Sequence, residues 1–185
     1  MKKFVVITFV LIIGLCLISF YMKYISANKS SNDIVIGKNT SGNFIAGLIL
    51  YRYILKKFNM PLRQLEEFAH INSNSVTAYF VDLNDDGKSE ILGVVSAAYY
   101  MNTEGYKLFI LQKNGKEYKD LSSLYILPQE GFLISASKIN GYKEIEMKAY
   151  SNREYLKGKY TIIPVYAMWD GEKYTYNYPK MKIYR

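Results

Sequence analysis

Four Asx-Gly pairs divide the part of the chain after about residue 74, and each lies between two segments of β-like sequence. An Asx-Gly pair tolerates the positive φ angles that tight hairpin turns require. The intervening segments are rich in Tyr, Val and Ile, as strands are. We therefore predict an antiparallel sheet or a small barrel of hairpins over residues 74–185. The pairs are Asp86-Gly87, Asn114-Gly115, Asn140-Gly141 and Asp170-Gly171, and the predicted strands span 76–81, 91–97, 106–111, 132–139, 144–150, 160–166 and 173–178.

Residues 44–72 have a helical pattern instead. Apolar residues recur at spacings of 4, 3, 4 and 3, which places them along one face of a helix. Ser41 or Asn43 can cap its start, and Pro61 suits the first turn of a second, shorter helix. We expect a helical hairpin that covers the sheet, which makes the fold α+β. A second membrane helix over 44–55 is the alternative, although the run is short and contains Arg52. The stripe comprises Phe44, Leu48, Tyr51, Leu55 and Phe58.

The N-terminus is unlike the rest of the chain. Nineteen residues without a charge, 4–22, follow Lys2 and Lys3 and precede Lys23. A helix needs roughly 20 apolar residues to cross a bilayer, so residues 1–25 are predicted to be a membrane anchor, with a cleaved signal peptide as the alternative. Paired lysines hold the N-terminus inside, and the domain at 44–185 then faces the periplasm or exterior. The Ser-, Asn- and Lys-rich residues 26–43 are expected to be a linker with little structure.

The charge and the cysteine content limit the kinds of partner and of stabilisation that the chain can have. The net charge is +8, and four lysines but no acids lie in the first 30 residues, so the remainder has a surplus of only +4 that is spread along the sequence. Nucleic-acid binding requires a clustered basic patch and is not predicted. The single cysteine, Cys16, lies in the N-terminal segment, so disulfides cannot stabilise the domain.

The stretch FVDLNDDGKSEIL, residues 80–92, places oxygen-bearing side chains at alternate positions between two apolar runs. A calcium ion takes six to eight oxygen ligands, and a chain that curls around it offers them at positions one, three and five, with a glycine at six for the sharp turn and a backbone carbonyl at seven. Counting from Asp82, those positions and the ninth are occupied by Asp82, Asn84, Asp86, Gly87, Lys88 and Glu90.

The loop resembles the calcium loop of FG-GAP and related VCBS-type repeats, Asp-x-Asn-x-Asp-Gly-x-x-Asp/Glu between two strands. An EF-hand would need flanking helices and a Glu at position twelve, where this chain has Gly93. The likeness covers about a dozen residues and a single loop, whereas those families carry several loops. A looser likeness to small bacterial exported proteins extends to 105–111, 140–145 and 169–174. The resemblance implies that Asp82, Asn84, Asp86 and Glu90 are side-chain calcium ligands, Lys88 a carbonyl ligand and Asp85 an outward-facing acid.

A metal-free acidic hairpin turn is the competing interpretation of the same residues. If calcium binds, we expect a structural role, because occupancy relieves repulsion among three carboxylates and fixes the hairpin. The loop offers no obvious open coordination position or nearby base for a reaction.

No catalytic constellation is visible, and an enzyme is not predicted. His70 is the only histidine, and no phosphate-binding loop or Cys/His zinc cluster occurs. Tyr174, Tyr176 and Tyr178 alternate in the last strand and share a face suited to contact with protein or sugar, unless they are ordinary sheet residues. We therefore predict an exported, membrane-tethered binding module with a structural calcium, of which an inhibitor or immunity-type protein is one form. The alternative is an envelope hydrolase that acts on glycan or peptidoglycan through acids near the loop.

Overall fold

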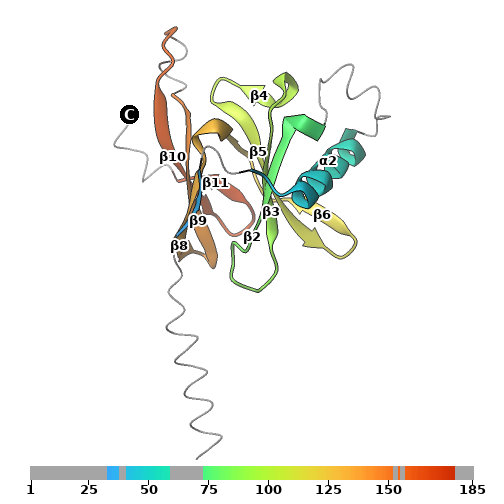
Figure 1. Ribbon diagram of the computed structural model, residues 1–185. Helices are drawn as coiled ribbons and strands as arrows, with labels where there is room; N and C mark the ends of the chain where they lie inside the picture. Colours follow the sequence, from blue (N-terminus) through green and yellow to red (C-terminus); the bar gives the residue numbers. More distant parts are fainter. Residues whose placement is uncertain (1–32, 38–40, 59–72, 152–153, 155–156, 178–185) are drawn as a thin grey trace, which may run out of the picture. The chain divides into compact units, whose positions relative to one another are not determined.

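The computed structural model describes residues 33–37, 41–58, 73–151, 154 and 157–177 (Figure 1). The predicted anchor at 1–25 and the second helix predicted after Pro61 lie outside these residues. Within them one α-helix is present, and no helix is long and apolar enough to cross a membrane.

The described chain is α+β, with one helix and two antiparallel sheets. The helix, α2, spans Phe44–Phe58. Three single turns of 3-10 helix occur: η1 at Ser73–Ser75, η2 at Ala98–Tyr100 and η3 at Pro128–Glu130. The strands are β1 Ile34–Ile36, β2 Val76–Val81, β3 Glu90–Val95, β4 Met101–Asn102, β5 Gly105–Asn114, β6 Glu117–Asp120, β7 Leu124–Ile126, β8 Phe132–Ile139, β9 Tyr142–Tyr150, β10 Ile162–Trp169 and β11 Tyr174–Tyr176.

One sheet has the strand order β1-β8-β9-β10-β11, and the other has β2-β3-β5-β4, with β6 and β7 also paired to the long strand β5. The prediction of antiparallel hairpins is confirmed: each of the four Asx-Gly glycines has a positive φ and connects neighbouring antiparallel strands. The alternative of a barrel is wrong, because neither sheet closes on itself. Strands β2 to β7 all belong to the sheet that contains β5, and the chain then crosses to the other sheet, where β8 and β9 form a long hairpin (Figure 1).

The elements form three layers, with the sheet built around β3 and β5 in the middle. On one face of this sheet, Leu92 and Leu108 belong to a core that contains Ile134 and Ile145 of the other sheet. On its opposite face, helix α2 covers a second core that includes Phe109. All six residues of β3 are buried, as expected of a strand covered on both faces. The middle layer is therefore the rigid base from which the β2–β3 loop projects.

Helix α2 confirms the first predicted helix, but its buried face is offset from the predicted stripe. Ala46, Leu50 and Ile54 are fully buried, whereas Phe44 is 77% exposed. Leu50 packs closely over the small residues Gly93 and Ala78 of the facing strands, so its face of the helix, and not that of Phe44, lies against the sheet. The Asn43 side chain caps the helix as predicted, since its Oδ1 accepts the Ala46 N–H at 3.1 Å.

Part of the predicted linker is structured. Strand β1 pairs with β8 in the register Ile34↔Ile134 and Ile36↔Phe132, and Asp33 Oδ1 accepts the Ala136 N–H at 2.6 Å. The expectation of little structure over 26–43 is therefore wrong for this triplet. Its Ile-Val-Ile sequence is β-branched throughout and Ile36 is buried, which compensates for the polar residues around it.

Candidate metal centre

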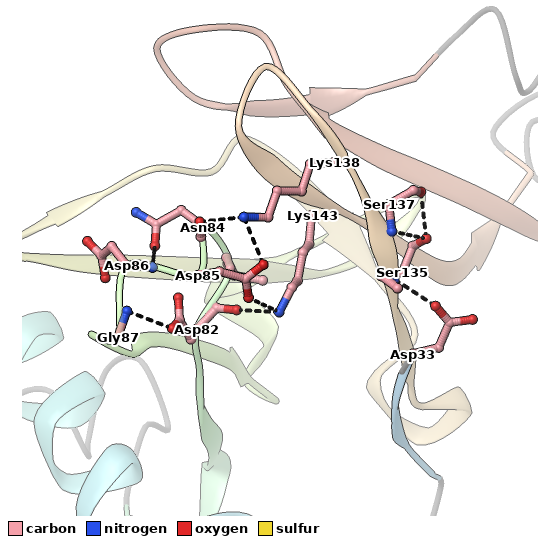
Figure 2. A network of polar contacts seen from close by, with 12 residues as sticks. Asp33, Asp82, Asn84, Asp85, Asp86, Gly87, Ser135, Ser137, Lys138 and Lys143 are labelled. Atoms are coloured by element: carbon pink, nitrogen blue, oxygen red, sulfur yellow. Dashed lines mark hydrogen bonds and ion pairs between the residues drawn. The ribbon is translucent and has the colours of Figure 1, made fainter. Parts of the chain in front are cut away.

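The predicted calcium loop connects β2 to β3, and its own side chains hold its backbone in a curl. Asn84 Oδ1 accepts the Asp86 N–H at 3.1 Å, and Asp86 Oδ1 accepts the Lys88 N–H at 2.7 Å. Asp82 Oδ2 reaches across the loop to the Gly87 N–H at 2.9 Å. Gly87 has a φ of +82°, a backbone conformation that residues with a side chain rarely adopt. The structure therefore brings the first, third, fifth and sixth loop positions together (Figure 2).

The carboxylate of Asp82 has one oxygen that the protein leaves unsatisfied. Oδ2 accepts the Gly87 N–H, but Oδ1 is buried and has no hydrogen-bond partner. An unmatched buried acceptor normally costs about 1–3 kcal/mol. A cation or a bound water would remove that cost, and the atom belongs to the first of the predicted metal ligands.

Glu90, the predicted ninth-position ligand, has its carboxylate in the protein interior. It is only 2% exposed, Oε2 accepts the Leu83 N–H at 3.0 Å, and Oε1 accepts Gln112 Nε2 at 3.2 Å. Burial raises the pKa of the Glu90 carboxyl, although these two hydrogen bonds oppose the shift. Each Glu90 oxygen accepts one of these bonds and retains a further lone pair with which it could ligate an ion.

Asp85 occupies a position that the family resemblance did not imply. Its Oδ1 lies 2.6 Å from Lys143 Nζ and its Oδ2 lies 2.7 Å from Lys138 Nζ, both on the β8–β9 hairpin (Figure 2). The acid that was expected to face outward therefore joins the two sheets through these two ion pairs, which we call the Asp85 clamp. Lys138 and then Lys143 hold the pKa of Asp85 below its ordinary value, because they stabilise the charged form.

Lys143 joins the loop to the neighbouring hairpin at three points. Its Nζ donates to the main-chain oxygen of Asp82 at 3.0 Å as well as to Asp85, and its backbone N–H donates to the Leu83 oxygen at 2.7 Å. The side chain is almost fully buried. Lys138 Nζ also donates to the Asn84 oxygen at 2.7 Å. Sequence reasoning missed both lysines, since their only signal is their place beside the Asn140-Gly141 turn.

The donor set fits a hard cation in part. Among the residues that the structure describes, no three or more His, Cys, Asp or Glu side chains are grouped to hold a metal ion. The loop offers a mixed set instead, with carboxylates of Asp82 and Asp86, the amide oxygen of Asn84 and the Lys88 carbonyl. Calcium accepts such mixed oxygen ligands, whereas zinc prefers nitrogen and sulfur. The chemistry of the loop therefore favours calcium over a transition metal.

The predicted aromatic face is divided between the core and the surface. Tyr174 is fully buried and its hydroxyl donates to the Lys143 oxygen at 2.8 Å, so it is not exposed to a partner. Tyr176 is half-buried, and its hydroxyl donates to Glu104 Oε2 at 3.0 Å. Tyr178 lies outside the described residues.

Comparison of the chain with family models, with curated proteins and with solved structures finds no match. The likeness to FG-GAP-type loops therefore depends on the residues of the 82–90 loop alone.

Proposed function

We propose that this protein is an exported, membrane-tethered binding module whose β domain is stabilised by a calcium ion in the 82–90 loop. The uncharged stretch at 4–22 supports the tether. The ion is supported by the internal hydrogen bonds of the loop and by its match to the calcium-loop motif at Asp82, Asn84, Asp86, Gly87 and Glu90. The role of the ion is structural: Asp82, Asn84, Asp86 and the Lys88 carbonyl hold it, and it supplies positive charge that fixes the curl.

The observation that supports calcium most strongly is the buried, unpartnered Oδ1 of Asp82. In a metal-free hairpin turn only a bound water could satisfy this oxygen, and without one its burial costs free energy. A bound cation satisfies it directly. Lys138 and Lys143 do not supply the missing donor, because their ammonium groups bind Asp85 and main-chain oxygens.

Calcium at about 2 mM should stabilise the full-length chain by about 1 kcal/mol, which raises its melting temperature by about 2–4 °C, if the loop binds like other extracellular modules. Thermal unfolding followed by circular dichroism, with calcium and then with a chelator, measures the difference. Asp86→Ala should abolish the response, because it removes one ligand and the bond to the Lys88 N–H.

Asp170→Ala is the matched control for this variant. Asp170 occupies the equivalent place in the Asp170-Gly171 turn, where its Oδ1 accepts the Glu172 and Lys173 N–H groups, but it has no neighbouring set of oxygens like that of the 82–90 loop. This variant should retain the calcium response. If calcium leaves the melting temperature of the unmodified chain unchanged, or if both variants respond equally, the loop is a metal-free turn.

Export is tested separately with reporter enzymes fused after residue 30. Alkaline phosphatase, which is active only outside the cytoplasm, should be active in this fusion, and β-galactosidase, which is active only inside, should not be. Replacing two residues near the middle of the uncharged stretch, Leu11→Lys and Leu15→Lys, should reverse both results, because charges near the centre of a span each cost about 3 kcal/mol. The opposite pattern in the unmodified fusion would place the domain in the cytoplasm.

A further inference from the structure

A groove runs between helix α2 and the β5–β6 hairpin, and none of its lining residues belongs to the 82–90 loop. It consists of two adjoining hollows of about 480 Å³ and 630 Å³ that share Tyr53, Lys57, Glu117 and Tyr118. We call it the α2–β6 groove. Both of its walls come from rigid elements, since α2 is packed on the middle sheet and β6 is bonded to β5. The groove is therefore a preformed cleft.

The charge of the α2–β6 groove is strongly positive. Six cationic side chains line it against two carboxylates, Glu117 and Asp120. Glu117 pairs with Lys56 at 2.5 Å and Asp120 pairs with Lys107 at 3.1 Å. Within the described part of the chain, the other four have no ion pair. This local excess equals the whole surplus of residues 31–185, so the fold gathers charge that is dispersed in the sequence. The four are Arg52, Lys57, Lys116 and Lys119.

The floor of the smaller hollow is apolar. Ile49, Tyr53 and Tyr118 are half-buried there, and they pack against the core beneath α2. The Tyr53 ring lies edge-on to the ring of Phe109, with centroids 6.3 Å apart, and Lys57 Nζ lies 5.8 Å from the Tyr53 centroid. The hollow has room for an apolar side chain, with cations around its rim.

We infer that the α2–β6 groove binds an acidic segment of another protein that also carries apolar anchor side chains. Carboxylates would face the cations Arg52, Lys57, Lys116 and Lys119, and a Leu or Phe would fill the apolar hollow. Such binding combines charge complementarity with burial. A bilayer surface is flat and does not enter a concave site. A polymer that offers only charge would leave the apolar floor empty. The inference depends on the proposed role as a binding module, because it assigns that module's working surface, but not on the calcium loop.

Fluorescence anisotropy of a labelled peptide tests the inference on the full-length chain. The probe is Glu-Glu-Leu-Glu-Phe-Glu-Glu-Leu, and it should bind at low salt and weaken as sodium chloride rises from about 50 mM to about 500 mM. Arg52→Glu combined with Lys116→Glu should weaken binding at least about tenfold, because both cations face the groove. Lys159→Glu combined with Lys173→Glu makes the same change of charge at exposed positions elsewhere and should have little effect.

Further probes separate the classes of ligand. Poly-L-glutamate, oligothymidylate and phosphatidylglycerol vesicles supply negative charge without the apolar anchors and should each bind more weakly than the peptide. If one of them binds as well as the peptide, the groove is not a site for a protein segment. Absence of peptide binding, or equal loss in both double variants, also overturns the inference. Asp86→Ala should bind the peptide normally, so failure of the calcium proposal and failure of the groove are distinguishable.

Discussion

Replacing Gly93 with alanine should lower the free energy of unfolding by about 3 kcal/mol, at the upper end of the cost of overpacking. Gly93 lies in the middle of β3, directly beneath α2. A Cβ atom there would lie 2.5 Å from Leu50 Cδ2, 2.7 Å from Ala78 Cβ and 3.0 Å from the Thr77 oxygen. Leu50 and Ala78 are fully buried, so neither side chain has space into which to move. Urea denaturation of Gly93→Ala and of the unmodified chain measures the difference.

Two further variants show whether the close approach of the helix is the cause. Leu50→Ala removes the atom nearest to the added Cβ and alone should cost about 3 kcal/mol. Combined with Gly93→Ala, it should cost less than the sum of the two single changes, because each removes part of the other's penalty. Gly115→Ala is the control, since its Cβ would meet nothing within 4 Å although its φ is positive, and it should cost only about 1 kcal/mol. A Gly93→Ala variant as stable as the unmodified chain would mean that the helix is not held this closely.

Local features of the fold were predictable from the sequence. The Asx-Gly turns depend on backbone preferences of two adjacent residues, and the start of α2 depends on a cap next to it, so a single sequence contains the necessary information. The division into two sheets was not predictable, because it depends on pairings such as Ile36↔Phe132 between residues far apart in the chain. The offset of the buried face of α2 has a similar origin, since it is decided by the small residues Gly93 and Ala78 on the facing strands.

In the candidate site, too, the features that depend on neighbouring residues were predictable, and those that depend on distant residues were not. The curl of the 82–90 loop arises from bonds between neighbours, and the spacing of its acids indicated it. The placement of Asp85 and Glu90 is decided by Lys143 and Gln112, which arrive from other strands. The α2–β6 groove was missed for the same reason, because its cations come from two segments that are far apart in the sequence, helix α2 and the β5–β6 hairpin. Spacing within one segment therefore predicts the loop but not its surroundings.

Asp85→Asn should destabilise the protein by about 2 kcal/mol at pH 7, because it leaves the buried ammonium group of Lys143 without its carboxylate. Loss of one partner of a fully buried ion pair costs about 3–5 kcal/mol, and this value is reduced here because the Asp85 side chain is 43% exposed and solvent screens the interaction. Urea denaturation in a chelator, which removes any contribution from calcium, measures the change. Glu172→Gln neutralises an exposed acid in the β10–β11 turn and should have almost no effect. Combining Asp85→Asn with Lys143→Met should restore part of the stability, since the unpaired buried charge is then gone.

The difference between Asp85→Asn and the unmodified chain should disappear in acid. The two lysines lower the pKa of Asp85 in the folded state from its ordinary value of 3.8, so the unfolded state binds the proton more readily. Stability from the clamp is therefore fully present above about pH 5 and is lost as the pH falls through 3.8 toward the lowered pKa. Below both pKa values the carboxyl is neutral in either state and resembles the amide of the variant. Unfolding curves of both proteins between pH 7 and pH 2 should converge at the acid end. A constant difference across that range would show that Asp85 stabilises the loop by its shape rather than by its charge.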